Sequence, residues 1–229
     1  MAKKKKKKKG FLYISLIAIS AFILSFILIN FYPIQVLELN FKDQLFEWRG
    51  LLDVSDSPTV LVAISQKADE EIPEKYPWPT SVHARLVENL NQAGAKVIAF
   101  DVLFEGRDSY DAKNDTLFAE AIKKHGNVIL AGELNKTTGD NAELTEPQFP
   151  IDILQQSNPN RTALVRVIPD LDGAIRTYNF GHIYEADSKN YYRLGIEVIK
   201  EYLDIPYEEI DETRPNPGSE YFKLGHMMC

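Results

Sequence analysis

The acidic residues that follow position 100 are the first group in this chain whose types and spacing suit cation binding. Their carboxylate oxygens are the ligands that hard cations such as Ca²⁺ and Mg²⁺ prefer. The spacing fits no EF-hand loop, however, and a solvated acidic loop has the same composition. We therefore predict a solvated loop without a metal, and keep a metal site as the alternative. The residues concerned are Asp101, Glu105, Asp108, Asp111 and Asp115.

The second group combines carboxylates with a guanidinium. Residues 169–173 read PDLDG and are followed by Arg176. One interpretation is a tight turn whose aspartates hydrogen-bond their own backbone, with Gly173 at a positive φ. The other is a polar ligand pocket in which Arg176 meets these carboxylates and further charged residues beside an aromatic wall. The candidate ligand-binding residues are Asp101, Arg107, Asp170, Asp172, Arg176 and Trp78.

The sequence has no pattern typical of an active site. It contains no nucleophile elbow, phosphate-binding loop, HExxH motif or paired-cysteine motif. The single cysteine, Cys229, allows no internal disulfide. We therefore predict no catalytic residue, no cofactor and no enzymatic activity for this chain. The four histidines are scattered, at His83, His125, His182 and His226.

Residues 77–104 predict the elements that would position the acidic group. A helix begins where Thr80 or Ser81 can cap its first turn, carries apolar residues at helical spacing, and ends at Gly94. The apolar run at 97–104 is typical of a strand that is covered on both faces of a sheet. Since ligands of parallel sheets bind beyond the carboxyl ends of strands, the acidic residues follow this strand at a suitable place.

Other apolar segments extend this pattern to an α/β fold. Strands and helices alternate in the order of a parallel sheet with right-handed crossovers, and the last two strands are predicted to form a hairpin. We predict a mainly parallel sheet flanked by helices, with a C-terminal hairpin and helix. The remaining predicted elements are strands 59–64 and 128–131, helices 115–124 and 192–203, a surface loop at 135–160, and a hairpin of 162–168 with 174–184.

The N-terminus has the features of a membrane anchor. Residues 11–32 contain no charged residue, and about 21 helical residues reach about 31 Å, close to the roughly 30 Å of a bilayer core. A cleaved signal peptide would have a shorter apolar region and a cleavage site after small residues. Because residues 3–9 are all lysine, the positive-inside rule keeps the N-terminus in the cytoplasm and places the rest of the chain outside. One transmembrane helix is thus predicted to precede the α/β fold.

The segment after the anchor is predicted to be an amphipathic connector helix. Leu37, Phe41, Leu45 and Trp48 recur at helical intervals. We expect this apolar stripe to pack on the globular domain, with a membrane surface or a partner helix as the alternatives.

The charge of the chain excludes one class of partner. The net charge is -7, but without residues 3–9 the chain keeps 19 basic against 33 acidic residues, a net charge of -14. Such a surface repels phosphate backbones, so nucleic-acid binding is excluded for the folded part. Apolar residues make up 45% of the chain, which suffices for a real hydrophobic core.

Several segments resemble the type-two CHASE domain, the cyclase and histidine-kinase associated extracellular sensor of bacterial receptors. Their order, spacing and position after an N-terminal anchor are similar to that family over most of residues 40–200. Members often have an acidic residue after the first strand, where this chain has Ser65 and Gln66. The matching segments are DQLFEWRG at 43–50, VLVAIS at 60–65, WPTSVHARLVENLNQAGAKVIAFDVLF at 78–104, LFAEAI at 117–122, NVILAG at 127–132 and IPDLDGAIRTY at 168–178.

The resemblance implies a sensor in the inner (plasma) membrane of a bacterium that controls a cytoplasmic effector outside this chain. An adenylate or guanylate cyclase is the expected effector, or a kinase, and the expected partners are an unknown small-molecule or envelope stimulus, the lipid bilayer and a second copy in a homodimer. The alternatives are a membrane-tethered metal-dependent hydrolase and a structural envelope protein. The predicted domains are a cytoplasmic tail at 1–10, an anchor at 11–32, a connector helix at 33–50 and a periplasmic sensory domain at 51–229 that is truncated at its C-terminus.

Overall fold

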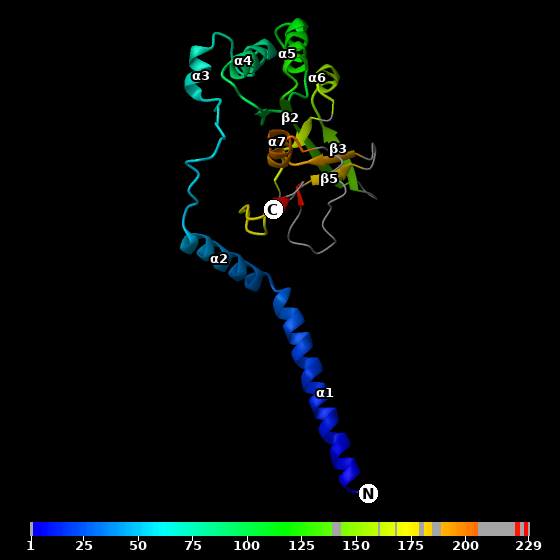
Figure 1. Ribbon diagram of the computed structural model, residues 1–229. Coiled ribbons are helices and arrows are strands. Elements are labelled where there is room, and N and C mark those ends of the chain that lie inside the picture. Colours follow the sequence, from blue (N-terminus) through cyan, green and yellow to red (C-terminus); the bar gives the residue numbers. More distant parts are fainter. Residues whose placement is uncertain are drawn as a thin grey trace. The chain divides into compact units, whose positions relative to one another are not determined.

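The chain forms two compact units, which a computed structural model describes (Figure 1). The first unit comprises Met1–Val62 and Pro169–Arg176, and the second comprises Ala63–Ile168 and Thr177–Cys229. The turn with the PDLDG sequence therefore groups with the N-terminal helices. The described residues are 2–138, 143–159, 161–167, 169–178, 181–184, 189–205, 223–224 and 227–228.

Two helices make up most of the first unit. Helix α1 covers Ala2–Ile29, and α2 covers Tyr32–Arg49 with Pro33 in its first turn, where a missing N–H has no cost. Among the described residues, no single helix is long and apolar enough to cross a membrane. The pair of Tyr13–Ile29 and Tyr32–Arg49, bent by 64°, passes the same test on length and composition alone.

The segment that follows α2 differs from the prediction. Residues 59–64 form no strand, and Val60 and Leu61 are 83% and 90% exposed. The prediction of a buried strand there is therefore wrong. An apolar, β-branched run has the propensity for a strand, but it becomes one only where a neighbouring strand takes its backbone hydrogen bonds, and no described strand pairs with this run.

The second unit is built on a four-stranded sheet in which β2 is central. The first half of β2 pairs in parallel with β1 on one side and β4 on the other, while its second half pairs with β3 in antiparallel orientation. The predicted parallel arrangement is confirmed for β1, α5 and β2, and the sheet as a whole is mixed. The strands are β1 Ile98–Phe100, β2 Val128–Thr138, β3 Glu143–Gln148 and β4 Thr162–Leu164.

Helices cover both faces of this sheet. Figure 1 shows α4, α5 and α6 on one face and α7 on the other. Residues 128–132 of β2 are consequently all buried. β1 is covered on one face only, since Ala99 is exposed between two buried residues, so the predicted strand at 97–104 is shorter and less covered than expected. The helices are α3 Gln66–Glu71, α4 Thr80–Gln92, α5 Ala112–His125, α6 Asp152–Ser157 and α7 Leu194–Tyr202.

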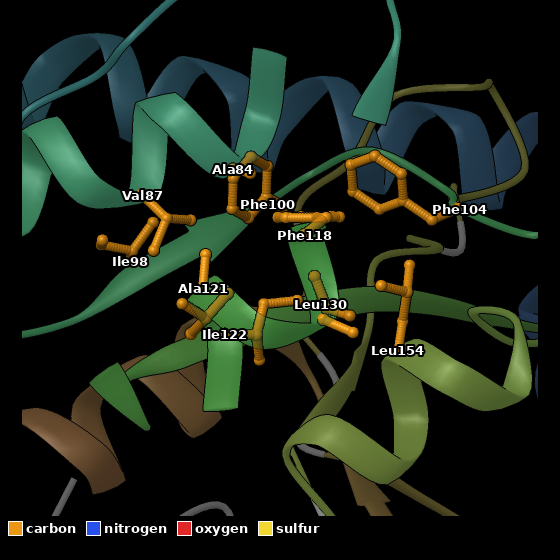
Figure 2. Close-up of a cluster of buried hydrophobic side chains, with 12 residues drawn as sticks. Ala84, Val87, Ile98, Phe100, Phe104, Phe118, Ala121, Ile122, Leu130 and Leu154 are labelled. Atoms are coloured by element: carbon orange, nitrogen blue, oxygen red, sulfur yellow. The ribbon is translucent and has the colours of Figure 1, made fainter. Parts of the chain in front are cut away.

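The main hydrophobic core lies between the sheet and the helices α4, α5 and α6. Figure 2 shows Phe118 of α5 at its centre, beside Phe100 and Phe104 from the segment that begins with β1. The ring centroid of Phe118 lies 5.6 Å from that of Phe100 and 5.1 Å from that of Phe104. Aromatic packing at these distances joins α5 to β1, at the edge of the sheet, and to the segment that follows β1.

The C-terminal hairpin is built from other strands than predicted. β5 Gly181–Tyr184 pairs with β6 Lys189–Tyr192, and α7 follows, so a hairpin and a helix are present. The predicted pairing of 162–168 with 174–184 is wrong, because β4 takes a parallel place beside β2. Residues 135–160 also contain β3 and α6 where a loop was predicted. A short antiparallel pair, β7 Lys223–Leu224 with β8 Met227–Met228, completes the described strands.

Candidate functional site

The guanidinium of Arg176 is the centre of the most elaborate polar cluster in the first unit. Its Nε and Nη2 donate to the two carboxylate oxygens of Asp43 on α2, both at 2.6 Å. Nη1 donates to Asp170 at 3.1 Å and to Asp172 at 2.8 Å, and Nη2 also donates to Asp172 at 2.7 Å. All five N–H donors of Arg176 are thus used, and its side chain is only 6% exposed.

The turn that carries these aspartates has the predicted geometry. Gly173 has φ 84°, and its N–H donates to the carbonyl of Asp170 at 2.9 Å. The carboxylate of Asp172 accepts from the N–H of Ala174 at 3.2 Å. The tight-turn interpretation is therefore confirmed, and the turn presents two carboxylates to Arg176 at the same time.

The electrostatics of the cluster favour its charged form. Hydrogen bonds from Arg176 lower the pKa of Asp43 and lower that of Asp172 to about 2. The same bonds raise the pKa of the Arg176 guanidinium, and the bond to Asp43 has the largest effect. One cation faces three carboxylates, and bidentate pairing of this kind fixes geometry as well as charge. The arrangement joins α2, which corresponds to the predicted connector helix, to the turn. We call the four residues Asp43, Asp170, Asp172 and Arg176 the clasp.

A comparison with protein families covers the part of the chain that contains the clasp. A family model described as the CHASE2 domain matches residues 19–227, which include all four members of the clasp. The chain belongs to the CHASE2 family. CHASE2 domains are extracellular sensory domains of signal-transduction receptors and are not catalytic. No curated protein and no solved structure shows significant similarity to the chain.

Of the predicted ligand-binding residues, the structure brings Asp170, Asp172 and Arg176 of this CHASE2 domain together. Sequence reasoning missed the fourth member, Asp43, although DQLFEWRG and IPDLDGAIRTY both carry the family resemblance. Asp101 and Arg107 are exposed residues of the second unit. A ligand pocket that these two residues share with the clasp stays a prediction.

Trp78 belongs to the aromatic packing of the second unit. It is buried, its ring packs edge-to-face on Tyr76, and its indole N–H donates to Asp69 at 3.1 Å. The prediction that its ring walls a ligand pocket is not tested by these contacts. They give Trp78 a structural role in the segment that leads into α4.

The acidic loop after β1 supplies a cap to a helix that is remote from it in the sequence. Asp108 accepts hydrogen bonds from the backbone N–H of Thr80 at 2.5 Å and of Asp111 at 2.9 Å, and from the side chain of Asn114 at 3.1 Å. Burial raises the pKa of Asp108, but these hydrogen bonds outweigh it and lower the pKa to about 2. The predicted local cap at Thr80 or Ser81 is wrong, since the side chain of Thr80 bonds Asp108 and Asp115 instead.

The same contacts bear on the alternative of a metal site. Asp115 is buried and accepts from Thr80 and from the N–H of Asp108, while Asp111 caps α5 by accepting from the N–H of Lys113. Within the described part of the chain, no group of three or more His, Cys, Asp or Glu residues is arranged to hold a metal ion. In this structure the acidic loop orders the N-terminal ends of α4 and α5.

Buried and half-buried charges on and beside α7 are a further feature that the sequence pattern did not reveal. Glu197 is buried and forms an ion pair with Lys200, and Arg161 forms one with Glu201. Burial raises the pKa of Glu197, against the lowering effect of Lys200. Glu197 and Lys200 both lie on α7, whereas the pair of Arg161 and Glu201 joins α7 to the residue that precedes β4.

His83 is expected to make the stability of this domain depend on pH. Its ring is buried among Phe100, Phe104 and Phe118, and burial lowers its pKa below the ordinary value of 6.5, while Asp108 opposes that shift. Below pH 6.5 the unfolded chain binds a proton that the folded ring resists, so we expect stability to fall as the pH drops from 6.5 toward 5. The ring resonances of His83 should titrate below pH 6.5.

His83→Gln provides the matching measurement. This variant is expected to lower the free energy of unfolding at pH 7 but to flatten its decrease between pH 6.5 and 5, because the titrating group is gone. Urea unfolding at several pH values measures both quantities. An unchanged slope in the variant would show that His83 is not the group responsible.

Proposed function

We propose that this CHASE2 domain is the extracytoplasmic sensor of a bacterial receptor anchored in the inner membrane by α1. The family match over residues 19–227 carries the proposal, since it assigns a sensory rather than a catalytic role. The lysines at 3–9 and the apolar segment 11–32 support an anchor with its N-terminus in the cytoplasm. The effector is a cytoplasmic adenylate or guanylate cyclase, or a kinase.

Signalling in such a receptor requires two states of the sensor. A stimulus, either a small molecule or an envelope component, shifts their populations only if it binds one state more tightly than the other. In a homodimer, the two states would differ in how the connector helices are held. The clasp supports this role for α2, because it joins the helix next to the anchor to a turn far along the chain.

Cysteine labelling tests the topology. In a chain with Cys229→Ser, Glu120→Cys on the exposed side of α5 should react with a membrane-impermeant maleimide in spheroplasts. Lys5→Cys should react only after the membrane is lysed. The reverse pattern would refute the proposed orientation, and equal labelling of both sites in intact spheroplasts would refute the anchor.

A further inference from the structure

Helix α2 has two unlike faces. Gln35, Val36, Leu39 and Asp43 are half-buried and lie on one side of the helix. The other side carries a stripe of large apolar side chains that are 41% to 70% exposed. A helical rotation of about 100° per residue places the members of this stripe within about 80° of one another. The apolar stripe consists of Ile34, Leu37, Phe41, Leu45 and Trp48.

The clasp holds α2 by the side opposite to the apolar stripe. Asp43 follows Phe41, the middle of the stripe, by two positions, which corresponds to a rotation of about 200°. Its carboxylate receives two hydrogen bonds from Arg176. The stripe is therefore turned away from the turn that α2 contacts, and within it Phe41 packs edge-to-face on Trp48 with ring centroids 6.4 Å apart.

The angle between α1 and α2 determines how α2 is inclined to the membrane plane. The two helices are separated by Asn30 and Phe31 and bent by 64°. If α1 runs along the membrane normal, α2 is inclined by the remaining 26° to the membrane plane. Spanning helices tilt by about 20° on average, and such a tilt of α1 toward the bend brings α2 almost parallel to the membrane surface.

We propose that α2 lies in the interface between lipid and water on the extracytoplasmic side of the inner membrane, with the apolar stripe in lipid and the clasp facing water. This inference rests on the proposed anchoring by α1. Aromatic side chains such as those of Phe41 and Trp48 are typical of the apolar face of interfacial helices. The apolar stripe thus contacts the lipid of the bilayer.

The pattern of the stripe favours lipid over a second copy of the helix. A coiled-coil seam through Ile34, Leu37, Phe41 and Trp48 would require an apolar residue at position 44, where the chain has Gln44. The apolar residue stands one position later, at Leu45, which widens the stripe into a face suited to an interface. A stimulus that moves the turn would then change the depth of α2 through Asp43.

Spin labels measure this arrangement directly. The full chain with Cys229→Ser is reconstituted into phosphatidylcholine vesicles and labelled at Leu45→Cys in the stripe, at Glu47→Cys as an exposed control on another side of α2, or at Ile23→Cys in α1. We expect the Leu45 label to collide more often with oxygen than with a water-soluble nickel chelate. The Glu47 label should show the opposite preference, and the Ile23 label should lie deepest in lipid.

The outcomes separate this inference from the proposed anchor. A lipid-exposed Ile23 label with a water-exposed Leu45 label would overturn the interfacial position of α2 and leave the anchor intact. A water-exposed Ile23 label would refute the anchor itself, and the inference with it. Spin–spin broadening at Leu45 with low oxygen accessibility would show that a second copy covers the stripe, which also overturns the inference.

Discussion

Arg176→Gln is expected to release the connector helix from the PDLDG turn. The substitution removes the charge and most donors of a side chain whose five N–H groups all bind carboxylates. Because several charge-assisted hydrogen bonds are lost together, we expect on the order of a tenfold fall in the ratio of docked to undocked turn. A pair of spin labels at Leu171 and Glu47 should show one narrow distance distribution in the parent chain and a broad one in the variant.

Two further variants make this test specific. Arg49→Gln removes the same charge from an exposed position of α2 and should leave the distance distribution narrow. The double variant Asp43→Arg with Arg176→Asp reverses the pair and should restore docking in part, since Arg at position 43 would again face carboxylates. A broad distribution in the Arg49 variant, or an unchanged one in Arg176→Gln, would show that the clasp does not hold the helix.

The release also predicts an effect on signalling. In a receptor that contains this domain and its effector, Arg176→Gln should change the basal output and weaken the response to the stimulus, because α2 would no longer follow the turn. A receptor whose output is the same with and without the clasp would transmit its signal by another route.

Phe118→Ala is expected to have the largest effect on stability. Phe118 is 0% exposed, and its ring contacts His83, Phe100 and Phe104. Replacing such a ring removes apolar burial and leaves a cavity, which costs about 3–5 kcal/mol. Since α4, α5 and β1 all meet at this side chain, the whole second unit should lose stability. Urea unfolding, monitored by the fluorescence of the buried Trp78, measures the loss.

The neighbouring residue supplies a matched control. Leu117 is 50% exposed on the same helix, so Leu117→Ala should cost less than about 1 kcal/mol. Phe118→Leu should fall between the two alanine variants, because it keeps part of the apolar volume. Equal losses for Phe118→Ala and Leu117→Ala would contradict the central position of Phe118 in the core.

The sequence predicted those features whose causes lie within a few residues. Gly94 follows the end of its helix at positive φ, and α4, α5 and α7 lie close to the predicted helices. The turn at Gly173 also follows from its own PDLDG sequence. In each case the backbone angle or the helix face depends on neighbours in the chain, so that the pattern of residue types suffices to predict it.

Tertiary structure decided the features that depend on distant partners. Asp43 and Arg176 are separated by 133 positions, and Asp108 caps a helix that begins 28 positions earlier. The apolar run at 59–64 shows the reverse, a strand-like sequence that forms no strand in this structure. Hydrogen bonds between remote segments form only after the chain has closed on itself, and no local pattern of residue types specifies which partners will then meet.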